Sequence, residues 1–126
     1  MTSMKDEMQE LMQRSYNHIV KQGGPSIDPM TKTCAYRGKE GAGCAAAPFI
    51  VNYDRKMEGL GWIEVVREFP KNIETTKHED FISGLQSCHD DAYTCQYLDF
   101  MEQFYRNIVA LAEAWKLEPP KEIRHA

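Results

Sequence analysis

The sequence has no long hydrophobic run and no excess of positive charge. Its longest apolar segment is Ala45–Val51, which is far too short to span a bilayer. The amino-terminal segment is polar and amphipathic and lacks the apolar core of a secretory signal, so we expect a cytoplasmic protein. A formal charge of −4 argues against duplex nucleic acid or a membrane as the main partner, because such partners usually meet a basic face.

Signatures of catalysis and of metal binding are also missing. There is no Gly-x-Ser-x-Gly motif, no Walker A loop and no Cys-x-x-Cys pair. We therefore expect no enzymatic activity and no cofactor. The wide spacing of the cysteines favours reduced, partly buried thiols, and a zinc site remains the minor alternative. Its candidate ligands would be Cys34, Cys44, Cys88 and Cys95.

The composition is that of one soluble α-rich domain over residues 1–126. With 42% hydrophobic and 27% charged residues, a chain of 126 residues can bury roughly two-thirds of its unfolded surface. A helix is predicted over residues 1–22, with Ser3 as its N-cap and glycines after its end. Its methionine-rich stripe is interpreted as core, although it could also pack against a second copy in a homodimer.

The rest of the chain divides into three parts. Residues 30–51 lack helical periodicity, and two extended segments around a glycine-containing loop predict a β-hairpin region. Residues 54–117 are predicted as a helical region, with its last helix beginning near Thr94, and residues 118–126 as a tail. The expected fold class is therefore α+β and predominantly α-helical, with three to four helices and one small β-hairpin docked on them.

Polar residues near the predicted end of a helix form the first candidate site. Gln86 precedes His89 by three residues and Asp90 by four, so Gln86 shares a helix face with His89 or Asp90. A histidine beside an aspartate can serve as a general base or bind a metal ion. The favoured interpretation is structural, with His89 ending the helix and hydrogen-bonding the hairpin.

The predicted hairpin loop forms the second candidate site. Its glycines could turn backbone N–H groups toward an anion, and Arg37 and Lys39 flank them. A plain solvated loop is favoured over a phosphate site, because no strand–loop–helix pattern surrounds these glycines.

Four short motifs follow one another along the chain: Cys34-x-Tyr36-Arg37-Gly38, Gly41-x-x-Cys44-Ala45, Tyr53-x-x-x-x-Glu58-Gly59 and Leu85-Gln86-x-x-His89-Asp90. Taken in this order over residues 10–117, they resemble a group of short proteins encoded by tailed bacteriophages and prophages. The chain departs from that group after Ala45, where the group usually has a glycine and a Leu-Ile. The resemblance implies a phage or prophage origin more directly than an activity. It also suggests contact between the motifs, with Arg37 reaching Asp90 or Asp91 and Tyr36 packed against the helix.

The leading hypothesis is a non-enzymatic phage-type protein that binds and modulates, and most simply inhibits, a host protein or complex in the host cytoplasm. A counter-defence factor such as an anti-CRISPR protein is one example. Exposed aromatic residues would contribute to the contact, with Trp62, Tyr93 and Tyr97 as candidates. The alternative is a small-molecule binder that sequesters a nucleotide or similar anion between the hairpin and the His89–Asp90 helix end. The candidate binding residues in both cases are Tyr36, Arg37, Lys39, Glu40, Gln86, His89 and Asp90.

Overall fold

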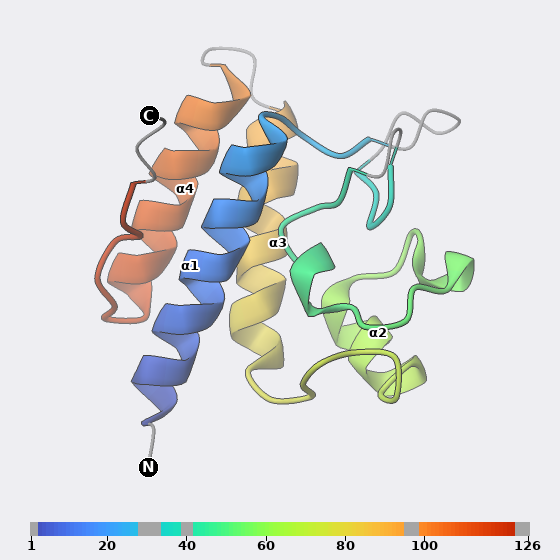
Figure 1. The fold of residues 1–126 in the computed structure, drawn as a ribbon. Helices are drawn as coiled ribbons and strands as arrows, with labels where there is room; N and C mark the ends of the chain where they lie inside the picture. Colours follow the sequence, from blue (N-terminus) through green and yellow to red (C-terminus); the bar gives the residue numbers. More distant parts are fainter. Residues whose placement is uncertain (1–2, 28–33, 39–41, 95–98, 123–126) are drawn as a thin grey trace.

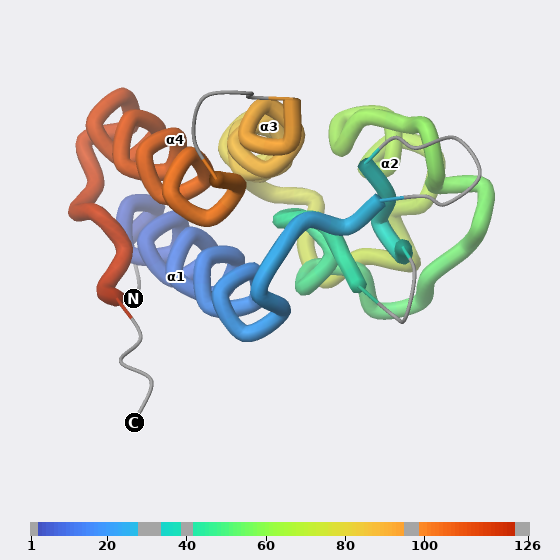
Figure 2. Tube along the Cα trace, turned by 90° about the horizontal axis from the view of Figure 1, so that it is seen from above, coloured from blue at the N-terminus to red at the C-terminus, as the bar shows by residue number. Residues whose placement is uncertain are grey.

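The structure is a computed structural model that describes residues 3–27, 34–38, 42–94 and 99–122. Helices α1, α3 and α4 lie side by side, and α4 runs opposite to the other two (Figure 1). Helix α2 and the irregular segments around it lie on the far side of α3 from α4 (Figure 2). We call residues 24–27, 34–38 and 42–78 the cap. The helices are α1 (Met4–Gln22), α2 (Trp62–Glu68), α3 (Glu79–Thr94) and α4 (Phe100–Ala114), with 3-10 turns η2 (Ala47–Phe49) and η3 (Arg55–Met57).

Helix α1 is the element that the sequence predicts best. The Ser3 side chain accepts a hydrogen bond from the Asp6 N–H, as an N-cap does. At the other end, Gly23 has a φ of 83°, in the left-handed region that glycine adopts without strain. The predicted stripe from Met8 to Ile19 is buried, whereas Met4 is 68% exposed. The interpretation of this stripe as core is therefore confirmed beyond its first turn.

Apolar packing joins the three long helices. The fully buried side chains of one apolar cluster include Phe81, Ile82 and Leu85 of α3 and Phe104, Ile108 and Ala112 of α4. The predicted start of the last helix is wrong, because Thr94 ends α3 and α4 begins at Phe100. The Asp99 side chain caps α4 by accepting the Glu102 N–H. None of the described helices combines the length and apolar character needed to cross a bilayer.

The tail after α4 is bound to α1 by two glutamine side chains. The Gln9 amide donates to the Glu118 carbonyl over 2.9 Å and accepts the Glu118 N–H over 3.0 Å. Gln13, one turn along, makes the same pair of bonds with Lys121, over 2.9 and 2.7 Å. Each glutamine thereby pairs with backbone as a neighbouring strand would, which keeps the described part of the tail against the bundle.

The predicted β-hairpin is wrong, and with it the α+β class. All regular elements of the described residues are helices. These residues contain no β-strand, only the isolated bridges Ile27–Cys34 and Ile50–Ile73. The segment predicted as the second strand instead forms the 3-10 turn Ala47–Phe49, with Pro48 in its first turn. Alanines favour helical backbone and proline disfavours a paired strand, so local preference opposed the extended form.

Polar side chains of α1 take the place of a partner strand. The Ser15 hydroxyl donates to the Ala45 carbonyl over 2.7 Å, and the His18 Nε2–H donates to the Gly43 carbonyl over 2.9 Å. The Gln22 side chain accepts the Gly43 N–H over 2.8 Å. These three residues are spaced along one face of α1, so buried backbone groups of the cap are satisfied without a sheet.

Two glycines of the cap serve close packing. A Cβ on Gly43 would lie 2.5 Å from the Ala47 Cβ, and one on Gly38 would lie 2.7 Å from the Ser26 hydroxyl. Neither distance is compatible with a side chain. Glycine is therefore required here by the approach of neighbouring atoms, which differs from the loop role that its position in the sequence predicted.

Candidate functional site: a cleft beside helix α3

A cleft of about 540 Å³ lies where the cap meets the second half of α3. Segments 34–36 and 59–61 form two of its sides, and Cys44 contributes to the wall. The residues that α3 contributes are Gln86, Asp90, Tyr93 and Thr94. All four sequence motifs thus supply lining residues, and the cleft volume is in the range of ligand pockets.

Tyr36 and Gln86 connect the walls of the cleft. The Tyr36 hydroxyl donates to the Leu60 carbonyl and accepts from the Gln86 Nε2, each over 2.7 Å. Gln86 Oε1 in turn accepts the Trp62 N–H over 3.1 Å at the start of α2. Burial raises the pKa of Tyr36 above its ordinary value, so its hydroxyl stays protonated. Tyr36 therefore packs against α3 as expected, and α2 is positioned from α3.

Glu58 is a central residue that the site prediction missed. Its carboxylate accepts the Tyr36 N–H over 2.9 Å and the Arg37 N–H over 3.0 Å. It also accepts the Tyr53 hydroxyl over 2.5 Å. The available signal was the third motif, which contains both Tyr53 and Glu58. One acidic side chain thereby holds the 36–37 segment against the rest of the cap.

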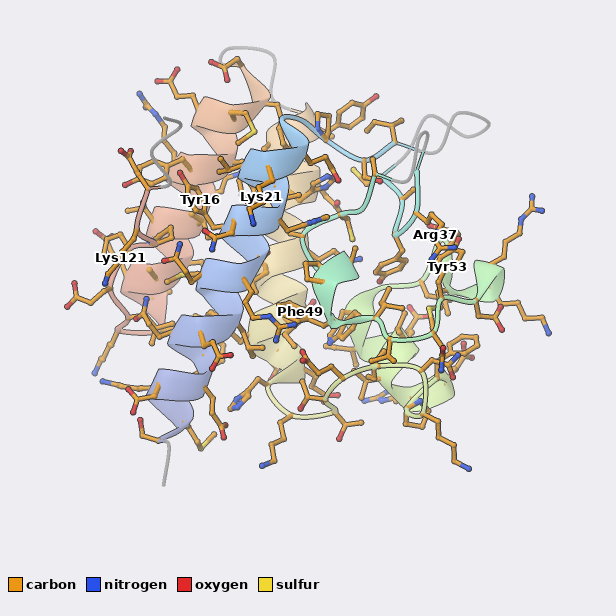
Figure 3. The ribbon with its side chains drawn as sticks, in the orientation of Figure 1. Tyr16, Lys21, Arg37, Phe49, Tyr53 and Lys121 are labelled. Carbon is orange, nitrogen blue, oxygen red and sulfur yellow. The ribbon has the colours of Figure 1, made fainter. Side chains whose placement is uncertain are left out.

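Arg37 does not form the predicted ion pair with Asp90 or Asp91. Its guanidinium lies over the Tyr53 ring, 4.3 Å from the ring centroid (Figure 3). Among the described residues, neither aspartate forms an ion pair with Arg37. Arg37 is exposed and lines a separate pocket of about 230 Å³. The reason is local, because Glu58 binds the backbone of this residue and sets its side chain beside Tyr53.

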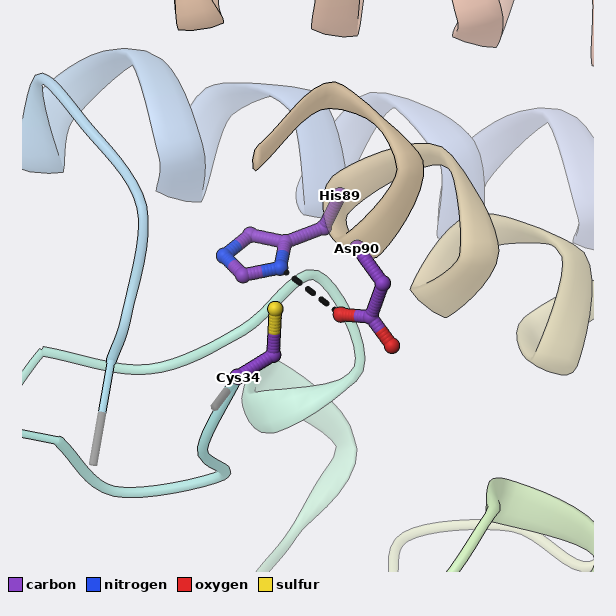
Figure 4. Close-up of side chains that lie close together, drawn as sticks. All are labelled: Cys34, His89 and Asp90. Atoms are coloured by element: carbon purple, nitrogen blue, oxygen red, sulfur yellow. Dashed lines mark hydrogen bonds and ion pairs between the residues drawn. The ribbon is translucent and has the colours of Figure 1, made fainter. Parts of the chain in front are cut away.

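His89 is fully buried and hydrogen-bonded at both ring nitrogens. Its Nε2 accepts the Ser26 N–H over 3.0 Å, so the ring hydrogen resides on Nδ1 and is donated to Asp90 Oδ1 over 3.0 Å (Figure 4). The prediction that His89 ends the helix and hydrogen-bonds a hairpin is wrong in both parts. Its partner is the Ser26 N–H after α1, and α3 continues beyond His89 to Thr94.

Ser26 is the second residue that sequence reasoning missed. Besides its N–H bond to His89, its carbonyl accepts the Ala35 N–H over 3.0 Å. Its hydroxyl donates to the Ala42 carbonyl over 3.1 Å. No helical pattern or motif marks this serine. Its role arises because three segments distant in the sequence converge on it.

Cys34, His89 and Asp90 each offer a ligand-type atom, and these atoms lie within 4.8 Å of one another (Figure 4). The hydrogen on His89 Nδ1 already occupies the position that a metal ion would need. Burial and the Asp90 carboxylate raise the pKa of Cys34 to about 12, so it is a neutral thiol near pH 7. These three side chains therefore suit a hydrogen-bonded cluster better than a metal centre or an activated nucleophile.

The four-cysteine zinc alternative gains no support. Burial also raises the pKa of Cys44 and of Cys88 to about 12. Within the part of the chain that the structure describes, neither residue joins a group able to hold a metal ion. Cys95 lies outside the described residues.

The remaining predicted site residues divide three ways. Tyr93 is 39% exposed at the cleft, whereas Trp62 is fully buried and so is wrong as a surface contact. Trp62 is instead core, packed between Tyr36 and Phe49. Lys39, Glu40 and Tyr97 lie outside the described residues.

The charge of the cleft is opposite to that expected for an anion site. Among the described residues that line the cleft, Asp90 alone carries a formal charge, and none is a lysine or an arginine. His89 and Arg37, which were expected in the same pocket, do not line this cleft. Asp90, Gln86 and Tyr36 do.

Comparisons with protein-family models, with curated proteins and with solved structures gave no significant match. The resemblance to short phage proteins therefore stays a prediction. Function is inferred below from the cleft itself.

Proposed function

We propose that this chain is a non-enzymatic interaction protein that binds another protein through the cleft beside α3. In line with the phage resemblance, the partner would be a host protein or complex whose activity it modulates, as a counter-defence factor does. The observation that carries the proposal is the state of the cleft walls. Tyr36 and Gln86 are hydrogen-bonded to other parts of this chain, and Asp90 is hydrogen-bonded to His89, which Ser26 holds in turn.

Such walls suit binding better than catalysis. A general base needs a free lone pair, and both nitrogens of His89 are engaged. A nucleophilic cysteine needs a lowered pKa, and the pKa of both Cys34 and Cys44 is raised to about 12. Walls fixed by internal hydrogen bonds also lose little conformational freedom when a partner binds, which favours affinity.

Tyr93 is the strongest candidate anchor for a partner. It lies at the cleft near the end of α3 and leaves 39% of its surface exposed. Tyrosine is enriched among residues that dominate binding energy, because it combines a large apolar ring with a hydroxyl. A nucleotide or similar anion is the less favoured ligand, since the described cleft residues supply a carboxylate and no cation.

The test is quantitative capture from a lysate of bacterial host cells, using tagged wild-type protein and two variants. Tyr93→Ala removes the proposed anchor, and Met4→Ala is the control because it removes an exposed apolar side chain on the first turn of α1. We expect one stoichiometric partner with the wild type and with Met4→Ala, and at least about tenfold less with Tyr93→Ala.

Two outcomes would overturn the proposal. One is equal recovery of the partner by Tyr93→Ala and the wild type. The other is a native mass spectrum in which the recovered chain carries only a small molecule and no protein.

A further inference from the structure

We infer that the cleft receives an arginine side chain from the partner, with its guanidinium on the Asp90 carboxylate and against the Tyr93 ring. This inference rests on the proposed function, since it specifies the chemistry of the protein that the cleft would bind. It concerns one side chain of the partner rather than the whole contact.

The first argument is charge. Asp90 brings the only formal charge among the described lining residues, and its side chain is 42% exposed. One carboxylate oxygen accepts the His89 Nδ1–H. A carboxylate has about four lone-pair sites, so further donors can be accepted, and a charged donor forms the strongest such bond.

The second argument is that two neutral polar side chains of the walls, Tyr36 and Gln86, are already paired. The Tyr36 hydroxyl and the Gln86 amide bond to each other, and their remaining bonds go to Leu60 and Trp62. A ligand that hydrogen-bonds these two side chains would have to displace these bonds. A cation needs only the Asp90 carboxylate, so the cleft discriminates in favour of positive charge.

The third argument is the placement of Tyr93. It lies three residues after Asp90 in α3, so the two side chains share a helix face. A planar guanidinium can contact a carboxylate through its edge and an aromatic ring through its face, whereas a lysine ammonium lacks this geometry. The molecule contains such a contact elsewhere, where the Arg37 guanidinium lies over the Tyr53 ring.

The fourth argument is size. A cleft of about 540 Å³ accommodates one long side chain with the peptide groups beside it. It is an opening between segments 34–36, 59–61 and the end of α3, and its lining includes backbone-exposing Gly59 and Gly61. A partner segment that inserts one arginine from a loop meets these dimensions.

The experiment is an NMR titration of the isotopically labelled full chain with N-acetyl-arginine methylamide. The neutral isostere N-acetyl-citrulline methylamide is the matched probe. We expect saturable shifts with the arginine probe at amides of residues 34–36, 59–61 and 86–94. The citrulline probe should bind at least about tenfold more weakly, because its urea group is neutral and cannot form an ion pair with the carboxylate.

Three variants make the test specific. Asp90→Asn retains an oxygen for His89 but removes the charge, and we expect at least about tenfold weaker binding of the arginine probe. Asp91→Asn removes the neighbouring exposed charge outside the cleft and should bind as the wild type does. Thr94→Lys places a tethered ammonium at the cleft, so it should block the probe even if Asp90→Asn fails to fold.

The outcomes separate this inference from the proposed function. Equal binding of the arginine and citrulline probes, or no shift at the cleft, overturns the arginine site. If the host partner is nevertheless captured through Tyr93, the proposed function stands without it. Arginine-specific shifts that Thr94→Lys abolishes support the site, and such shifts without any captured partner would count against the proposed function alone.

Discussion

The bundle of α1, α3 and α4 and the cap are held together by different forces. The bundle joins long helices through fully buried apolar side chains such as Phe81, Phe104 and Ile108. The cap also has apolar residues, but its segments 34–38 and 42–46 are fixed by hydrogen bonds from side chains to backbone. This part of the cap therefore takes its shape from polar groups on its neighbours.

That difference explains where the cleft lies. Helices pack closely along their apolar stripes, which leaves few openings. Parts of the cap are held by single hydrogen bonds, such as those of Glu58 and Gln86, and need not pack along the whole of α3. The chain can therefore leave an opening next to α3. The cleft lies at this boundary, with a rigid helix on one side and hydrogen-bonded backbone on the other.

The largest effect is expected from a cavity in the bundle. Phe104 is fully buried and stacks with Tyr16 and Phe100. Phe104→Ala should lower the free energy of unfolding by about 3–5 kcal/mol, through lost burial and an unfilled cavity. Chemical denaturation measures this change, and Tyr93→Ala is the exposed aromatic control, expected to change stability by less than about 0.5 kcal/mol. A Phe104→Ala protein as stable as the control would show that the bundle is not the dominant core.

The second effect should be confined to the cap. Glu58→Ala removes the acceptor for two backbone N–H groups and the Tyr53 hydroxyl, so we expect a loss of about 2–3 kcal/mol. Hydrogen exchange should accelerate at the amides of Tyr36 and Arg37, while amides in the middle of α3 stay protected. Glu58→Gln retains one acceptor oxygen and should be intermediate. Uniform acceleration across both regions would contradict the idea that the cap opens separately.

The bundle is the region that the sequence predicts. Apolar residues at helical spacing, together with Ser3 and Gly23, predict α1 nearly to its ends. The boundary between α3 and α4 is harder to predict from the sequence, because Thr94 and Asp99 both resemble helix starts and only tertiary packing distinguishes them. Local periodicity is sufficient where each helix buries a stripe of its own.

The cap and the site could be predicted only in part. The motifs placed Tyr36, Gln86 and Asp90 near one another, and they do line one cleft. The roles of Ser26 and Glu58 could not be predicted from the sequence. They depend on hydrogen bonds of backbone groups, and these bonds leave no pattern in the amino-acid sequence. For the same reason, the sequence predicts a hairpin where the structure has an irregular segment bonded to α1.

The smallest effect is expected at the seam between the two regions. The buried Ser15 hydroxyl on α1 donates to the Ala45 carbonyl of the cap. Ser15→Ala leaves that carbonyl without its donor, and we expect a loss of about 1–2 kcal/mol in the free energy of unfolding. Ser87→Ala is the matched control, because Ser87 is an exposed serine within α3, where alanine should be neutral or slightly stabilising.

Hydrogen exchange then shows on which side of the seam the loss appears. If the cap depends on polar groups supplied by α1, Ser15→Ala should accelerate exchange at Ala47 and Phe49, whose N–H groups close the η2 turn beside Ala45. Amides in the middle of α1 should keep their protection, because that helix is held by its apolar stripe. Faster exchange in α1 with an unchanged cap would reverse this dependence and make the cap the support of the helix.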